Sequence, residues 1–365
     1  MESKGRNQTF NFLYVIAILM VIDDHTSSRI GFFTSIFPYN SFYMPMFVFA
    51  SGYFYKKCSL LQNVKHKVKK LLIPYIICNI IAMGLAFIID RIFNVNWVTI
   101  PTLKTIKEMF FSTSPTTLNG ASWFVIMLFW VSISYNVIRQ IFKENKPMDI
   151  ILSIILISAA FVSIYLCTKG YANRGLKWIF ILKIIFYVQF YHMGYMFKKY
   201  LEQWILKYSK LLVCSICILI NVLLVLKYDY QINFYSTNSM GHFSIWFLPL
   251  ITSITGILFY YEISNFLANK VGYVPLFDII GRNTFAIMQV HLLFVNIPNF
   301  YIYHKISHGS VNYPDFDVTG FINGAWVRYN ADARLMGFIC GVIGSILICC
   351  IIEYLRKMYN KKRES

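Results

Sequence analysis

Two aspartates and a histidine follow one another at positions 23 to 25, at the end of the first apolar run. Ionisable side chains are costly in a membrane-spanning segment, so each one there needs an explanation. His25 has a side chain that titrates near neutral pH and suits a general base for a hydroxyl nucleophile. Asp24 is a candidate to stabilise the resulting imidazolium, although neighbouring helical residues point about 100° apart. The alternative is that these three residues only mark the membrane boundary.

A second histidine lies inside a later apolar run, in the stretch IGRNTFAIMQVH (280–291). Arg282 stands at the inner end of this run, and His291 follows nine residues later. At a rise of about 1.5 Å per residue, His291 is expected near the middle of the membrane. It is either functional or satisfied by a hydrogen bond between helices. In a third run, Lys183 is expected to snorkel outward and His192 to reach the inner interface.

Two further stretches combine apolar residues with small or basic ones. In SFYMPMFVFASGYFYKK (41–57), Pro45 is expected to kink the helix or to end an earlier turn. Ser51 and Gly52 allow a close approach of helices, which packing alone would also explain. The lysine-rich stretch VKHKVKKLLIPY (64–75) is expected to be a loop followed by the start of a helix. It is either a topology signal that faces anionic lipid or a docking surface for a phosphate-bearing cytoplasmic donor.

The composition predicts the elements that position these residues. Of the 365 residues, 57% are hydrophobic, 18% aromatic and only 14% charged, whereas soluble domains carry about 25% charged residues. The apolar residues form runs about as long as the roughly 20 residues that cross a bilayer. These runs are too long for barrel strands and do not alternate, so only helices satisfy their backbone in lipid. The sequence therefore predicts an all-α polytopic membrane protein.

About ten transmembrane helices are expected in a single domain over residues 1–365, with no attached soluble domain. Their expected bounds are 10–28, 36–55, 71–92, 121–141, 149–168, 176–197, 210–227, 243–262, 277–303 and 334–355. Lys and Arg are about twice as frequent on the side of the N-terminus as on the other side, which predicts cytoplasmic N- and C-termini.

The net charge of +18 is concentrated in the short loops between the apolar runs, so it favours a topology signal over nucleic-acid binding. The eight cysteines are scattered without metal-ligand spacing, so no metal site is expected.

The order of these motifs resembles the acyltransferase-3 family, which includes fucose 4-O-acetylase-like and exopolysaccharide O-acetyltransferases. The matching pieces are the first run ending in His25, PMFVFASGYF (45–54), LLIPY (71–75), ASWFVIMLFW (121–130), FYHMGYMFKK (190–199) and GRNTFAIMQVH (281–291). The resemblance implies a ten-helix enzyme that moves an acyl group, usually acetyl from acetyl-CoA, to a sugar hydroxyl. His25 matches the family's catalytic histidine. Arg282 and His291 match its ninth-span arginine and the histidine that closes that motif.

One position departs from the family pattern. Members often carry a basic residue eleven positions before the first-span histidine, where this chain has Tyr14. Eleven residues are about three helical turns, so this position shares a face with His25. The charge that holds the donor is then expected from Lys65, Lys69 or Arg282.

The resemblance also implies the partners. Acyl-CoA is expected as a cytoplasmic co-substrate with no permanently bound cofactor, and the acceptor as a surface glycan or lipid-linked sugar at the cell membrane. The high Ile, Lys and Asn content indicates a bacterial protein. Ser51, Asn283 and Trp123 are candidate donors of hydrogen bonds to the oxyanion. Membrane lipid is a further partner, nucleic acid is not expected, and the oligomeric state is open. Two other functions fit the same sequence: a transporter or flippase of a polysaccharide or lipid-linked sugar, and a scaffold subunit of a synthase complex.

Overall fold

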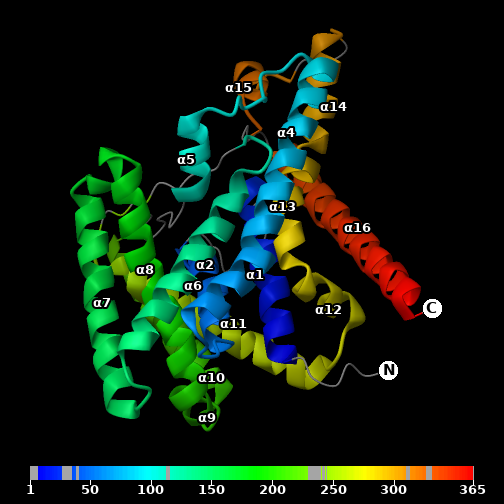
Figure 1. Ribbon diagram of the computed structural model, residues 1–365. Helices are drawn as coiled ribbons and strands as arrows, with labels where there is room; N and C mark the ends of the chain where they lie inside the picture. Colours follow the sequence, from blue (N-terminus) through cyan, green and yellow to red (C-terminus); the bar gives the residue numbers. More distant parts are fainter. Residues whose placement is uncertain are drawn as a thin grey trace.

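The computed structural model describes residues 7–26, 35–37, 41–111, 116–228, 240, 243, 245–309, 313–325 and 331–364 (Figure 1). Every regular element in these residues is a helix. The longer helices are α1 (Gln8–Thr26), α2 (Tyr43–Tyr53), α4 (Ile73–Phe93), α6 (Trp123–Ile141), α7 (Lys146–Thr168), α8 (Leu176–Met196), α10 (Lys210–Tyr228), α11 (Leu248–Val271), α13 (Thr284–Val295), α14 (Ile297–Ser307) and α16 (Ala331–Glu364). The shorter helices are α3 (Leu60–Lys67), α5 (Leu103–Phe111), α9 (Glu202–Ile205), α12 (Pro275–Arg282), α15 (Val318–Asn323), the π-helical turns η3 (Val68–Leu72) and η6 (Phe197–Leu201), and the 3-10 turns η4 (Gly120–Ser122) and η5 (Tyr171–Arg174).

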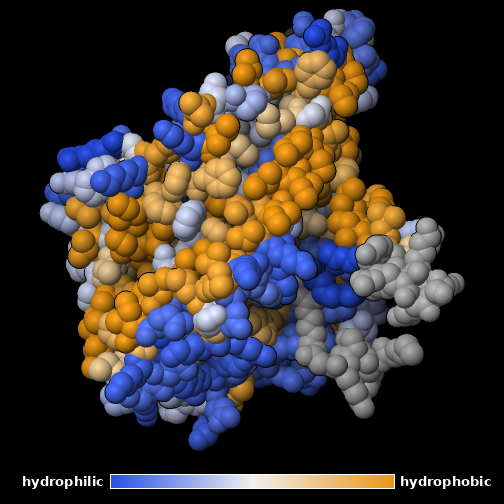
Figure 2. Space-filling model, in the orientation of Figure 1, coloured by the Kyte–Doolittle hydropathy of each residue, from blue (hydrophilic) through white to orange (hydrophobic). Residues whose placement is uncertain are grey.

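Nine helical segments in the described part of the chain are long and apolar enough to cross a membrane. They are Gln8–Thr26, Leu60–Phe93, Gly120–Ile141, Lys146–Thr168, Leu176–Ile205, Lys210–Tyr228, Leu248–Val271, Thr284–Ser307 and Arg334–Met358. Hydrophobic residues cover the middle of the face in Figure 2, and hydrophilic residues gather toward its lower and upper ends. Large apolar side chains such as Ile80 and Leu211 are 63% and 76% exposed. Lipid is the solvent that makes such exposure favourable, so the chain is an all-α polytopic membrane protein.

The remaining expected crossing, 36–55, corresponds to the short helix α2. Its 11 residues extend about 16 Å at about 1.5 Å per residue, against a hydrocarbon core of about 30 Å. α2 nevertheless returns the chain alongside α1, because Tyr43 contacts Asp24 near the end of α1 and the Tyr53 ring lies 4.2 Å from that of Phe10 near its start. All of its residues except Ser51 are buried, so neighbouring helices surround it and lipid thickness does not set its length.

Glycines bring the backbones of α2 and α8 into contact. A Cβ atom at Gly52 would overlap the carbonyl oxygen of Tyr191 on α8. A Cβ atom at Gly194 would likewise overlap the carbonyl oxygen of Phe49 on α2. Small residues are what permits such contact between membrane helices. The close approach expected at Gly52 is confirmed, and Gly194 is its counterpart on the other helix.

The single helix expected at 277–303 is replaced by α12, α13 and α14. A single residue separates α12 from α13, and Asn296 separates α13 from α14. Pro298 explains the second break, because it lacks the N–H that would continue the hydrogen bonding of α13, whereas proline is tolerated in the first turn of the new helix α14. The Asn296 side-chain amide donates hydrogen bonds to the carbonyl oxygens of Leu292 at 2.8 Å and Ala325 at 3.0 Å, and so holds the break in place.

The lysine-rich segment at 64–70 is helical, which corrects the expectation of a loop. α3 begins at a capping box in which the Ser59 hydroxyl accepts the backbone N–H of Gln62, while the Gln62 side chain accepts that of Ser59. The helix then continues through the π turn η3 into α4. A capping box satisfies two helix N–H groups at once, so the basic side chains are presented from a regular, fixed surface.

α12 links the first and last helices at one end of the bundle. The Asn11 side-chain amide of α1 donates to Asp278 Oδ1 on α12 at 3.4 Å. Arg282 at the end of α12 lies 3.4 Å from Glu353 Oε2 on α16. The start of α1 and the later part of α16 therefore lie at the same end of the domain. The expected ten crossings require this, because an even number of crossings returns the chain to the side on which it began. That this end is cytoplasmic stays a prediction from the Lys and Arg distribution.

A buried ion pair fastens α6, α7 and α8 to one another. Arg139 NH1 lies 2.7 Å from Asp149 Oδ1, and both side chains are fully buried. Asp149 Oδ2 accepts hydrogen bonds from Lys199 Nζ at 3.0 Å and from the Tyr200 hydroxyl at 2.8 Å. His192 Nε2 lies 3.1 Å from the Asp149 carbonyl oxygen. Buried charges persist when they are paired in this way, so this cluster fixes the relative positions of the three helices.

Candidate active site

The two histidines singled out by the sequence meet inside the bundle. The ring centroids of His25 and His291 lie 5.0 Å apart, with an angle of 30° between the ring planes. His25 is in the last turn of α1, and His291 is fully buried on α13. Their contact places both imidazoles at the same depth, near the end of α1. A fully buried imidazole in contact with a partly exposed one forms a candidate acid–base centre.

The hydrogen bonding of His291 defines which of its nitrogens is available. Its Nδ1 lies 3.0 Å from the carbonyl oxygen of Ile287. A carbonyl oxygen only accepts, so Nδ1 carries the proton and Nε2 of the neutral ring keeps its lone pair. Nε2 is buried and has no hydrogen-bond partner among the described residues. His291 therefore presents a basic nitrogen to the interior of the bundle.

A row of glycines on α16 lets α1 and α13 come together. A Cβ atom at Gly341 would lie 2.8 Å from Val295 Cγ2 on α13 and 2.9 Å from Ile22 Cγ2 on α1. One at Gly337 would lie 3.2 Å from the Val295 carbonyl oxygen and 3.6 Å from Thr26 Cγ2. Gly337 and Gly341 have the spacing at which small residues line one face of a membrane helix. The sequence carries this signal, and the sequence analysis missed it.

Asp24 is joined to α2. The Tyr43 hydroxyl donates a hydrogen bond to Asp24 Oδ2 at 3.0 Å. Asp23 is 3% exposed, and its carbonyl oxygen accepts the Thr26 hydroxyl at 2.9 Å. These bonds anchor the last turn of α1, which carries His25. The expectation that Asp24 stabilises a protonated His25 stays a prediction.

Tyr14 and Ser51 both lie next to Phe47 of α2. The Tyr14 ring is stacked on the Phe47 ring, with 6.1 Å between centroids and 17° between planes. The Ser51 hydroxyl donates to the Phe47 carbonyl oxygen at 2.9 Å. The Ser51 proton is thus used within its own helix, which leaves its oxygen as an acceptor and weakens its candidacy as an oxyanion donor.

Arg282 and Asn283 belong to a separate ionic cluster at the other end of α13. Arg282 lies 3.0 Å from Asp278 and 3.4 Å from Glu353, and its side chain is 44% exposed. The Asn283 amide donates to Glu353 at 3.1 Å, and its oxygen accepts from Arg356 at 3.1 Å. A helical rise of about 1.5 Å per residue puts these side chains some 12 Å from the histidine on α13. The structure does not bring them to the histidine pair.

Lys65 and Lys69 project from α3 and η3, and both are exposed. Neither has a contact with the histidine pair in the described residues. Their position on one continuous basic helix fits the surface for a phosphate-bearing donor that the sequence analysis proposed. The alternative, attraction to anionic lipid headgroups, fits the same position.

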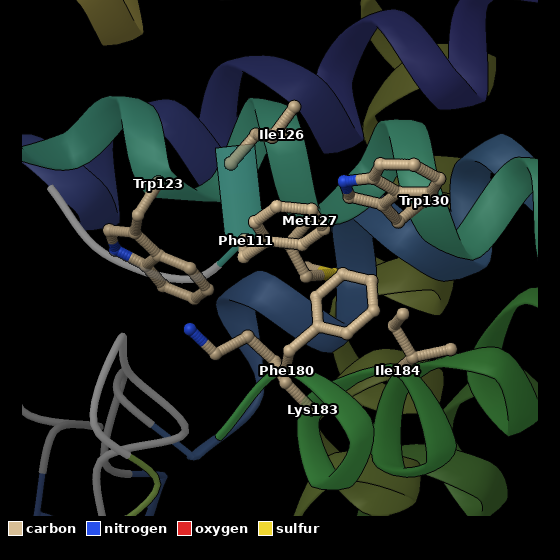
Figure 3. A pocket seen from close by; sticks show the side chains of 8 residues that line it. All are labelled: Phe111, Trp123, Ile126, Met127, Trp130, Phe180, Lys183 and Ile184. Atoms are coloured by element: carbon tan, nitrogen blue, oxygen red, sulfur yellow. The ribbon is translucent and has the colours of Figure 1, made fainter. Parts of the chain in front are cut away.

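Trp123 begins α6 and lies beside a lysine. Lys183 Nζ of α8 is 4.8 Å from the centroid of the Trp123 ring, and both residues line one recess (Figure 3). The Lys183 side chain is 2% exposed. It points inward, so the expectation that it snorkels to the interface is wrong. The aromatic ring supplies a favourable surface for the ammonium group, which explains its inward direction.

A polar cluster behind α13 escaped the sequence analysis. The Asn119 side-chain amide donates to Gln289 Oε1 at 2.6 Å and to Asn79 Oδ1 at 3.1 Å. Gln289 stands two residues before His291, so its side chain leaves α13 on nearly the opposite face. The cluster fixes the turn η4, and hence Trp123, against α13. Single amides within or beside apolar runs gave no signal for it, because the sequence does not show which of them lie close together in space.

The fold and the histidine pair together define an integral membrane protein with a candidate acid–base centre. The chain belongs to the acyltransferase-3 family, because the family's acyltransferase domain matches residues 7–354, nearly the whole length. The protein is therefore a membrane acyltransferase. Searches of curated proteins and of solved structures found no match.

Proposed function

We propose that this acyltransferase moves an acyl group, most simply acetyl, from acyl-CoA to a hydroxyl group of a cell-surface carbohydrate, with His25 as the general base. The observation that carries the proposal is the contact between His25 and His291. These residues lie far apart in the sequence and belong to two segments that are apolar enough to cross a membrane, Gln8–Thr26 and Thr284–Ser307, where ionisable groups are rarely casual.

The proposed reaction is a single transfer. His25 takes the proton of the acceptor hydroxyl, and the oxygen attacks the thioester carbonyl carbon. The carbon–sulfur bond breaks, and the departing CoA thiolate receives the proton from His25. The products are the acylated sugar and free CoA thiol, so atoms and charge balance without a further reactant.

His291 assists His25 in this scheme. Its Nδ1 is held by Ile287, and its Nε2 accepts a hydrogen bond from the acceptor hydroxyl or from the protonated His25. A second imidazole at 5.0 Å also disfavours a permanent positive charge on both rings, because two like charges at that distance repel. One of the pair therefore stays neutral and able to act as a base.

The donor is proposed to approach from the end of the domain that carries the basic helix. Lys65 and Lys69 are exposed there. Arg282 is already paired with the carboxylates of Asp278 and Glu353. The two lysines are therefore the stronger candidates to bind the phosphates of a coenzyme.

The test is thiol release from acetyl-CoA by purified protein in nanodiscs, with and without envelope polysaccharide from the host, together with mass spectrometry of the glycan. His25→Ala and His291→Ala are the test variants. His304→Ala is the matched control, because His304 is exposed and its ring lies 4.2 Å from that of His308 in a second histidine pair. Loss of a general base lowers the rate by about 10²- to 10⁴-fold. If the protein is an acyltransferase with His25 as its base, thiol release by His25→Ala is expected to fall by this factor.

Retention of wild-type turnover by folded His25→Ala would overturn the assigned base. Failure of the folded wild type to release thiol from any short acyl-CoA, with movement of glycan across the membrane, would favour the transporter. Full function of His25→Ala only inside a stoichiometric complex would favour the scaffold subunit.

A further inference from the structure

The short helix α13 depends on its neighbours for its orientation. Asn283 separates it from α12 and Asn296 separates it from α14, so it is not part of a longer continuous helix. It packs against α1, α16 and the turn η4. The His291 ring is bonded within the helix, from Nδ1 to the carbonyl oxygen of Ile287. The direction of this imidazole therefore follows any rotation or shift of α13.

The middle of α13 is held by the side chain of Gln289. This side chain is buried, and its Oε1 accepts a hydrogen bond from Asn119 Nδ2 at 2.6 Å. Gln289 Nε2 has no hydrogen bond in the described part of the chain. The bond from Asn119 is therefore the hydrogen bond that satisfies this amide there. An amide in an apolar interior is costly when it is unbonded, so the position of Gln289 is closely tied to that of Asn119.

Asn119 is itself fixed by two further elements. Its Nδ2 also donates to Asn79 Oδ1 on α4 at 3.1 Å. Its backbone N–H donates to the hydroxyl and carbonyl oxygens of Thr116 at 3.2 and 3.3 Å. Asn79 and Asn119 are both fully buried. Asn119 therefore connects Gln289 to α4 and to the segment that leads into η4 and α6.

Gln289 is the residue of this amide cluster that lies on the same helix as His291. The two are separated by two positions, or about 3 Å of helical rise. The amides that bound α13, Asn283 and Asn296, lie about 12 Å and about 8 Å from His291 by the same measure. Side chains two positions apart leave a helix about 200° apart. A bond on the far face of α13 therefore sets how the helix is turned, and so whether His291 faces α1.

We propose that Gln289 is a positioning residue, which holds His291 against His25 through the hydrogen bond from Asn119. The inference rests on the proposed function, because it names a residue that maintains the histidine pair of that reaction. Misplacement of a catalytic group by about 1 Å lowers turnover by about 100-fold. The bond acts on the histidine pair and not on the donor, so its loss lowers kcat and leaves KM for acetyl-CoA unchanged.

Gln289→Met is the test variant, because methionine keeps the length of the side chain and removes the amide. Thiol release from acetyl-CoA by the protein in nanodiscs, with envelope polysaccharide present, should show a kcat that is about 10- to 100-fold lower. Gln289→Glu keeps an oxygen that accepts a hydrogen bond from Asn119, so it should retain more turnover than Gln289→Met. Wild-type kcat in folded Gln289→Met would overturn the proposal.

Asn221→Leu is the matched control for the loss of a buried amide. Asn221 Nδ2 on α10 donates to the Thr255 hydroxyl on α11 at 2.7 Å, and both residues are buried. Neither of these helices contains a histidine. Asn221→Leu should lower the unfolding midpoint about as much as Gln289→Met does, and it should keep kcat. If both variants lose stability and turnover in the same proportion, Gln289 has only a packing role and the proposal fails.

A double substitution separates positioning from packing. If Gln289 acts through His291, Gln289→Met should lower kcat in the wild type and should cause no further loss in His291→Ala. A further loss of the same size in the His291→Ala background would contradict the proposal. Asn119→Ala removes the same hydrogen bond from the other side, and it provides the same comparison if Gln289→Met does not fold.

The pattern of results separates this inference from the proposed function. If His25→Ala and His291→Ala lose turnover while Gln289→Met does not, the acyl transfer stands and the positioning role falls. Wild-type turnover of His291→Ala would refute the positioning role together with the part given to His291, and His25→Ala would still decide the base. If the folded wild type releases no thiol from acyl-CoA, the proposed function falls and the inference falls with it.

Discussion

Replacement of Gly341 by alanine should separate the two histidines without touching either one. The added Cβ would lie 2.8 Å from Val295 Cγ2 and 2.9 Å from Ile22 Cγ2, whereas carbon atoms pack at about 3.5 to 4.0 Å. Relief therefore needs a shift of about 1 Å on each side. Both neighbours are β-branched with one favoured helical rotamer, so α1 and α13 must move apart as bodies.

The expected effects follow from that displacement. Overpacking of this kind costs about 1–3 kcal/mol of stability. Misplacement of catalytic groups by about 1 Å lowers turnover by about 100-fold. Gly341→Ala should therefore lose much more activity than its stability loss explains, while remaining folded in nanodiscs.

The assay is thiol release from acetyl-CoA, with the unfolding midpoint of the same samples. Gly84→Ala is the matched control, because Gly84 lies in the membrane helix α4 and no atom lies within 4 Å of an added Cβ. Alanine there should keep activity and gain up to about 1 kcal/mol of helix propensity. If Gly341→Ala matches Gly84→Ala in both measurements, the glycine row does not set the histidine contact.

Three other substitutions probe the packing and the donor site. Asp149→Asn should leave the fully buried Arg139 without its carboxylate and lower the free energy of unfolding by about 3–5 kcal/mol, measured by denaturation in detergent. Glu144→Gln, at 32% exposure and 3.9 Å from the same guanidinium, should change it by at most about 1 kcal/mol. Tyr14→Arg should leave thiol release intact or lower KM for acetyl-CoA, because it restores the family's basic residue at position 14, where the Tyr14 side chain is half-buried. Complete loss of turnover by folded protein would refute the hypothesis that a basic residue at this position helps to hold the donor.

The sequence predicted the helices because a long apolar run has few alternatives in lipid. Hydropathy averages over a window, however, and does not register what surrounds a helix. It therefore gave α2 the bounds 36–55, although Gly52 and Gly194 bury a shorter helix against α8. It also gave one helix at 277–303, where Pro298 and the hydrogen bonds of Asn296 divide the segment.

The candidate site, too, was predictable from the sequence only in part. The cost of ionisable groups in apolar runs was enough to single out His25, His291 and Lys183 from the sequence alone. Which of them would meet depended on contacts between residues far apart in the chain. Helical periodicity assigns a residue to a face of its own helix, but it does not name the helix that covers that face.

The sequence by itself determined that this is an all-α membrane protein with costly ionisable residues in its spans, because length and polarity alone fix where a chain can lie in a bilayer. Only the tertiary structure decided that His25 faces His291 and that Lys183 turns inward to Trp123. The physical reason is close packing: glycines on α16 set the distance between α1 and α13 through contacts that no single segment contains.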